Sequence, residues 1–150
     1  MKKTKFISLC ILLTITYCSR AQTHHSQMTN QTVVNTFLAG FNDINKVGQS
    51  FALLAENYHF TDPTTTVNSK AEFLELSKAL AEVLTGVEVV RMAESGNWVS
   101  VHYIFKSSVP GLEVNKANEW FRIKDGIIQE SHLIFDATHW RTILSEESHE

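Results

Sequence analysis

Three side chains of the sequence are candidates for acid–base chemistry: Asp62, Glu119 and His132. Glu119 stands in an apolar-rich strand pattern, where a period of two places it on the same face as Phe121 and Ile123. A carboxyl group on such a face costs several kcal/mol if it is charged and unpaired, so its pKa rises and it keeps its proton. A neutral acid in a pocket can then donate a hydrogen bond to a developing oxyanion.

Each candidate also has a structural interpretation, which the residues leave open. Glu119 could lie on a twisted or edge strand and pair with Arg122 or a lysine in solvent, because glutamate is rarely buried. Asp62 precedes Pro63, and such turns recur because Asp caps turn amides while Pro fixes φ. A single histidine in a strand is usually structural, but histidine is the residue type suited to carrying protons near neutral pH, which makes His132 a candidate.

The N-terminus has the pattern of a secretory signal peptide. Residues 1–5 are basic, residues 6–17 are apolar, and small residues precede a cleavage position after Ala21. The apolar run is too short for a comfortable membrane span, so a membrane anchor is the lesser alternative. A lipid anchor at Cys18 is the other alternative, which the bulky Tyr17 disfavours. We therefore expect a secreted or periplasmic protein with no membrane partner after cleavage.

Length, cysteine content and charge narrow the class of protein. The 150 residues suffice for one domain, and both cysteines lie before residue 22, so the cleaved chain would have no disulfide. Cleavage leaves 9 basic against 16 acidic side chains, which argues against a nucleic-acid partner. We expect no metal and no cofactor; the His24–His25 pair lacks a third ligand at fixed spacing. The expected parts are a signal peptide (1–21), a flexible leader (22–29), a cone-shaped domain (30–142) and an acidic tail (143–150).

The order of the predicted elements indicates an α+β fold. An apolar stripe predicts a helix from Asn30 to Phe41, and a second helix is expected over Val47–Glu56, followed by a strand over Tyr58–Thr61. A capping box at Ser69 opens a third helix, with Gly86 as its stop. Alternation and turn signals then predict four strands, over residues 87–92, 98–105, 112–123 and 127–135, with a tight hairpin at residues 124–126.

Helices first and strands last favour a curved antiparallel sheet packed against three N-terminal helices. Such a cone leaves a hollow where a small hydrophobic molecule would bind. Alternatively, the phenyl rings of Phe37, Phe41, Phe51 and Phe105 fill the hollow.

The segment from Val33 to Asp136 resembles the nuclear-transport-factor-2-like superfamily, within it the SnoaL-like and ketosteroid-isomerase-like branches. The resemblance rests on four pieces, namely the first helix, the stretch Leu54–Pro63, the helix opened by Ser69, and the hairpin Asn118–Ile128 with Phe135-Asp136 ending the last strand. It implies the fold more strongly than the chemistry.

The resemblance also implies roles for single residues. In ketosteroid isomerases the Asp of the Asp-Pro turn is the general base, which corresponds to Asp62, and the protonated acid of the oxyanion hole corresponds to Glu119. The tyrosine of that hole corresponds to Phe37, which cannot donate a hydrogen bond; Tyr58 is a candidate replacement. In SnoaL-like cyclases acids and histidines inside the cone do acid–base work, which His132 or Asp136 could do here.

Two functions follow as hypotheses. One is cofactor-free acid–base catalysis of the isomerase or cyclase type, in which Asp62 takes a proton and Glu119 or His132 stabilises or returns it. The other is a non-catalytic module that binds a ligand or takes part in assembly. In both cases the expected ligand-binding side chains are Phe37, Tyr58, Tyr103 and Phe121.

The outer face of the sheet is a candidate interface. Trp120 and Arg122 lie there in the predicted alternation, and both residue types are enriched at interfaces. Many members of the superfamily that the sequence resembles pair through this face, so the resemblance implies a homodimer.

Overall fold

The computed structural model describes residues 28–147, with side chains up to residue 142. The signal peptide, Cys18, the histidine pair and the side chains of the acidic tail lie outside the described residues. The elements are α1 (Asn30–Ala39), a 3-10 turn (Ile44–Lys46), α2 (Val47–Ala52), β1 (Leu54–Thr61), β2 (Thr66–Val67), α3 (Lys70–Val83), β3 (Leu84–Ser95), β4 (Trp98–Ser107), β5 (Val114–Lys124), β6 (Ile127–Phe135) and α4 (Thr138–Glu147).

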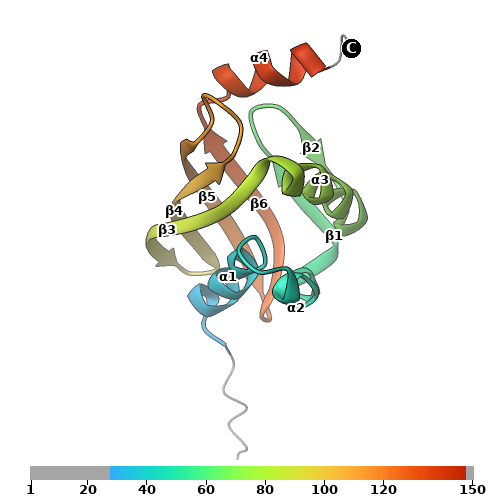
Figure 1. The fold of residues 1–150 in the computed structure, drawn as a ribbon. Helices are drawn as coiled ribbons and strands as arrows, with labels where there is room; N and C mark the ends of the chain where they lie inside the picture. Colours follow the sequence, from blue (N-terminus) through green and yellow to red (C-terminus); the bar gives the residue numbers. More distant parts are fainter. Residues whose placement is uncertain (1–27, 148–150) are drawn as a thin grey trace, which may run out of the picture.

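The predicted α+β class with a curved sheet is confirmed. Six strands form one sheet in the order β2-β1-β6-β5-β4-β3, and helices α1, α2 and α3 pack within its curve (Figure 1). The sheet is mixed rather than purely antiparallel, because β1 pairs with β6 in parallel. Tight hairpins force neighbouring strands to run antiparallel, but β1 and β6 are joined only through α3 and the rest of the sheet.

Helix α1 forms as the sequence predicts. The Oγ1 of Thr29 accepts a hydrogen bond from the backbone N–H of Thr32 at 3.2 Å, which caps the helix. The side chains that face the sheet are fully buried, namely Val33, Val34, Phe37 and Leu38.

The second helix is shorter than predicted. It ends at Ala52, and β1 begins at Leu54, where a helix up to Glu56 was expected. The backbone N–H of Ile128 donates to the carbonyl of Leu53 at 2.8 Å, so pairing with β6 begins immediately after the helix. This tertiary pairing overrides the helix propensity of the Leu-Ala-Glu segment.

The capping box of α3 is confirmed. Ser69 Oγ accepts from the N–H of Glu72 at 3.1 Å, and the Glu72 carboxylate accepts from the N–H of Asn68 at 2.7 Å. In the usual capping box the glutamate accepts from the N–H of the N-cap residue, here Ser69. In this helix Glu72 accepts instead from Asn68, one residue earlier.

The prediction that Gly86 stops α3 is wrong. The helix ends at Val83 and the chain turns directly into β3 at Leu84. Gly86 lies in β3 with φ +155°, and a Cβ there would stand 2.7 Å from the Oδ1 of Asn42. Asn42 uses that oxygen and its amide to bond the backbone of Val87 at 2.7 and 2.9 Å. The glycine thus makes room for a bond between the loop after α1 and the sheet.

The strands from β3 to β6 form the predicted meander. Asp125 and Gly126 both have positive φ, 53° and 78°, which gives the tight hairpin its right-handed strand twist. The inward faces of these strands and of the helices build one core, whose largest fully buried side chains include Tyr58, Tyr103, Phe37 and Phe121.

Helix α4 was not predicted from the sequence. Asp136 Oδ1 accepts from the N–H of Thr138 at 3.0 Å at its start, and Arg141 donates to the carbonyl of Pro63 at 2.9 Å. These bonds hold α4 across the end of the sheet where β6 finishes (Figure 1). Within the described part of the chain, no helix combines the length and the apolar character that a membrane span requires.

Candidate functional site

Glu119 points into the core and has only 4% of its surface exposed. Tyr103 donates its phenolic hydrogen to Oε2 at 2.6 Å, and Ser131 donates to Oε1 at 2.6 Å. The phenol of Tyr58 lies 2.6 Å from Ser131 Oγ, so the four side chains form one buried chain of hydrogen bonds. We call these four residues the Glu119 network.

Sheet register explains why these side chains meet. Tyr103 on β4 is paired with Ala117, and Ser131 on β6 is paired with Phe121, two positions to either side of Glu119 on β5. They therefore reach the carboxyl group as diagonal neighbours on the same face. The alternative in which Glu119 pairs with Arg122 does not hold, because Arg122 bonds Glu130 at 2.6 Å on the opposite face.

Burial controls the titration of the Glu119 network. It raises the pKa of Glu119 to about 7, against the opposing effect of the hydrogen bonds from Ser131 and Tyr103. The pKa values of Tyr103 and Tyr58 lie well above their usual range, mainly because of burial and then because of the nearby Glu119 charge. Glu119 is thus the group of the network that exchanges a proton near neutral pH.

The hollow around Glu119 is nearly filled. A cavity of only about 30 Å³ remains, to which Glu119, Tyr103 and Phe37 contribute; space of this size holds about one water. Phe37 contacts Phe41 and Phe121, each with ring centroids 5.7 Å apart. Of the four phenyl rings named as an alternative filling of the hollow, Phe37, Phe41 and Phe105 line this space and Phe51 does not. We call this space the inner cavity.

A larger space lies at the open end of the cone. It has a volume of about 430 Å³, and we call it the outer chamber. It lies between the turn after β1, the second half of α3, the end of β6 and Trp140 of α4. Its lining is mostly apolar, namely Phe60, Leu76, Ala79, Leu80, Val83, Leu84, Phe105, Leu133, Phe135 and Trp140, with Asp62, Thr64, Thr65 and Glu82 as polar members.

The structure places Asp62 in a turn that it caps and at the lining of the outer chamber. Its Oδ1 accepts three hydrogen bonds, from Thr64 N at 2.6 Å, Thr64 Oγ1 at 2.8 Å and Thr65 N at 2.7 Å. Its Oδ2 accepts none from the described residues, and the side chain lines the outer chamber. One oxygen therefore holds the turn and the other remains available to a ligand.

The structure does not bring Asp62 and Glu119 into one space. Asp62 lines the outer chamber and Glu119 the inner cavity. Four apolar side chains line both spaces and form the wall between them, namely Phe60, Leu80, Phe105 and Leu133. Contact between a single ligand and both acids would require this wall to move.

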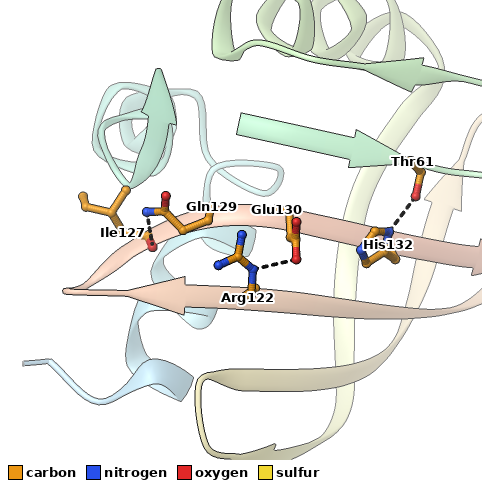
Figure 2. A network of polar contacts seen from close by, with 6 residues as sticks. All are labelled: Thr61, Arg122, Ile127, Gln129, Glu130 and His132. Atoms are coloured by element: carbon orange, nitrogen blue, oxygen red, sulfur yellow. Dashed lines mark hydrogen bonds and ion pairs between the residues drawn. The ribbon is translucent and has the colours of Figure 1, made fainter. Parts of the chain in front are cut away.

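His132 lies on the outer face of the sheet, away from both spaces. Its Nδ1 is 2.8 Å from Thr61 Oγ1, and its ring stacks on Trp98 with centroids 6.0 Å apart. Figure 2 shows the hydrogen bond between Thr61 and His132 beside the Arg122–Glu130 ion pair on the same face. Trp98, Trp120 and His132 border a shallow groove there. Asp136 is exposed and occupied in capping α4.

A further cavity of about 340 Å³ lies between α2 and α3. The charged residues that line it are occupied elsewhere, since Asp43 pairs with Lys46 and Lys78 with Glu75. It contains no acid with a free oxygen comparable to that of Asp62. No three His, Cys, Asp or Glu side chains among the described residues are grouped so as to hold a metal ion.

Most residues that line these spaces were not among the predicted site residues, and Ser131, Trp140 and Glu82 are examples. Ser131 carried a weak signal, as a small polar residue on a face shared with Leu133 and Phe135. Trp140 and Glu82 carried none, because α4 was not expected and Glu82 lies on the polar side of a helix pattern. Trp140 is buried, and its indole N–H has no hydrogen-bond partner among the described residues.

Comparison with known proteins agrees with this architecture. No curated protein matches the sequence. The SnoaL-like domain family matches residues 34–131. An NTF2-like protein of unknown function from Cytophaga hutchinsonii superposes with a TM-score of 0.65 at 20% identity, covering 77% of this chain and 96% of that one.

Two further solved structures share the fold. A candidate polyketide cyclase from Sinorhizobium meliloti has a TM-score of 0.62 at 16% identity, covering 71% of this chain and 99% of its own. A hypothetical protein with a ketosteroid-isomerase-like fold from Catenulispora acidiphila, in complex with trimethylamine, has a TM-score of 0.61 at 12% identity, covering 70% of this chain and 85% of its own. The family match spans most of the chain and these neighbours share its curved sheet, so the protein belongs to the SnoaL-like domain family, with an NTF2-like fold.

Proposed function

We propose that the protein binds a small, largely apolar molecule in the outer chamber. The observation that carries this proposal is a space of about 430 Å³ lined mainly by apolar side chains, with a carboxylate oxygen of Asp62 left free. Pockets for small ligands have this composition, an apolar lining with a few polar groups that fix orientation. A fold neighbour in complex with trimethylamine supports a small organic molecule as the kind of ligand.

Asp62 would orient the ligand. Its Oδ2 accepts no hydrogen bond from the described residues, so it can accept one from the ligand. The N-terminal sequence pattern adds export to this proposal, so the ligand would be met outside the cytoplasm.

The test is binding followed by NMR with a small panel of apolar alcohols, ketones and amines. Perturbed amide signals are expected in the turn after β1, the second half of α3 and the end of β6. Asp62→Asn is expected to keep the turn, because its amide oxygen still accepts, and to weaken binding about 3- to 10-fold through the changed group at Oδ2. Asp125→Asn, at the hairpin tip, is the matched control. Signals confined to the cavity between α2 and α3, or no binding at all, would contradict the proposal.

A second candidate function is acid–base catalysis by the Glu119 network. The observation that favours catalysis is the carboxyl group of Glu119, which has a pKa of about 7 and accepts a hydrogen bond from the phenol of Tyr103 at 2.6 Å. A group that titrates near the working pH suits general acid–base catalysis. Two fold neighbours carry names that include polyketide cyclase and ketosteroid isomerase. This function requires the wall of four apolar side chains to open.

Turnover on enolisable ketones separates the two functions. If Glu119 acts as the acid, Glu119→Gln is expected to lower kcat by a factor of about 10²–10⁴ while binding in the outer chamber is retained. Tyr103→Phe is expected to give a smaller loss through the same bond. A parent protein with no turnover on any of these compounds would leave only the binding function.

A further inference from the structure

From the charges and rings around the outer chamber, we infer that its ligand is a small organic cation of the alkylammonium class. This inference rests on the proposed function, since it takes the outer chamber as the binding site. It concerns which molecules the chamber selects.

Among the described residues that line the outer chamber, the two charged ones are both acidic. Asp62 comes from the turn after β1 and Glu82 from the last turns of α3, so they approach from different elements. Glu82 makes no hydrogen bond or ion pair with the described residues, and Asp62 has one free oxygen. Arg141, which follows Trp140, donates to the carbonyl of Pro63 and is not part of the lining.

Aromatic rings make up much of the remaining lining. They come from four separate elements, namely Phe60 of β1, Phe105 of β4, Phe135 of β6 and Trp140 of α4. The rings of Phe135 and Trp140 stand edge to face, with centroids 6.2 Å apart. Rings attract cations through their negative faces, and groups of aromatic rings recognise quaternary ammonium ions in this way.

The combination discriminates between classes of apolar ligand. A carboxylate ligand, such as a fatty acid, would meet two like charges with no base among the described lining residues to offset them. A neutral ligand would gain from the apolar lining but would gain no charge attraction from the two carboxylates. An alkylammonium ion gains from the rings, the apolar walls and the two carboxylates together.

Three probes of nearly the same shape test this inference. Choline is cationic, 3,3-dimethylbutan-1-ol is its neutral counterpart, and 3,3-dimethylbutanoate is an anion with the same branched head. In low salt, choline is expected to bind at least about tenfold more tightly than the alcohol. The anion is expected to bind most weakly, and added salt is expected to reduce the preference for choline.

Variants that neutralise the two carboxylates test whether the preference for choline over the alcohol arises in the outer chamber. The double variant Asp62→Asn, Glu82→Gln is expected to bind choline and the alcohol about equally. Glu75→Gln is the matched control, because it removes the same charge from α3 but lies outside the lining. Should the double variant fold poorly, Glu82→Gln alone is expected to reduce the preference by a measurable part, because Glu82 holds no other residue in place.

The outcomes separate this inference from the proposed function. Alcohol bound in the chamber as tightly as choline overturns the cationic ligand but keeps the chamber as the binding site. A preference for choline that survives in the double variant also overturns the inference, because the charge then acts elsewhere. Absence of binding by all three probes overturns both.

Discussion

At the scale of single residues, Glu119 is the group whose chemistry depends most on its surroundings. Its carboxyl group can be buried in the core because Tyr103 and Ser131 donate hydrogen bonds to its two oxygens. Burial nevertheless disfavours its charged form, and this places its pKa at about 7. The same group therefore influences both the stability of the fold and any proton transfer at the base of the cone.

Glu119 is expected to make the protein less stable as the pH rises from about 4.5 to 7. Its pKa is raised on folding from 4.5 to about 7, so the unfolded chain ionises first, and the stability contributed by the proton is lost through this window. The full effect is about 3 kcal/mol as an order of magnitude. Urea unfolding of the parent and Glu119→Gln across this range measures it, and the variant is expected to show the flatter profile.

The comparison needs a control for the other titrating groups. Glu88→Gln removes a carboxylate that pairs with Lys106 at the surface, and its profile is expected to follow that of the parent. If the free energy of unfolding changes with pH by the same slope in the parent and in Glu119→Gln, then the pKa of Glu119 is the same in the folded and unfolded chain, and the prediction is wrong.

At the scale of elements, the junction between α1 and α2 depends on a close backbone approach. Ser50 of α2 is buried and donates its hydroxyl to the carbonyl of Phe37 at 2.6 Å. Gly40 ends α1 at this point, and a Cβ there would lie 2.5 Å from the Cβ of Ser50. The two helices can cross only because residue 40 has no side chain, which in turn seats Phe37 at the base of the cone.

Two glycine substitutions test this junction. Gly40→Ala is expected to destabilise the fold by about 2–4 kcal/mol, because the methyl group must displace Ser50 and break its buried bond. Gly48→Ala, in α2, meets nothing within 4 Å and is expected to stabilise the protein by up to about 1 kcal/mol. Thermal unfolding measures both, and similar melting temperatures for the two variants would contradict the interpretation.

At the scale of the whole molecule, the two faces of the sheet differ in character. The inner face is covered by α1, α2 and α3, whereas the outer face exposes Trp120 by 42% and Ile134 by 61% beside the Arg122–Glu130 pair. Exposed apolar side chains bordered by polar ones are typical of an interaction surface. The homodimer through this face stays a prediction.

A variant that places charge on the outer face tests the homodimer. The parent is expected to have twice the mass of one chain in solution, and Trp120→Asp is expected to shift the mass to that of one chain by weakening association at least about 30-fold. Ile44→Asp is the control, because Ile44 is 83% exposed but lies in the turn before α2. A parent mass equal to one chain would exclude the dimer at that concentration.

Local patterns were sufficient for most of the fold. The cap at Thr29, the capping box at Ser69, the alternation along β4 and the positive φ values of the hairpin each depend on residues close together in the sequence. The inward direction of Glu119 also followed from alternation, although its burial did not. Strand pairing across the sheet was harder to predict from the sequence. The first residue of β1 and its parallel direction depend on pairing with β6, which lies more than seventy residues later in the chain.

The sequence by itself determined that acidic side chains stand on a half-buried strand and in an Asp-Pro turn, because alternation and turn chemistry are local properties. Tertiary structure alone decided that Tyr103 and Ser131 enclose Glu119, and that a wall of four apolar side chains separates it from Asp62. Tertiary structure also brought Trp140 and Glu82 to the outer chamber. These contacts join distant segments, so they depend on packing and register, which no local pattern specifies.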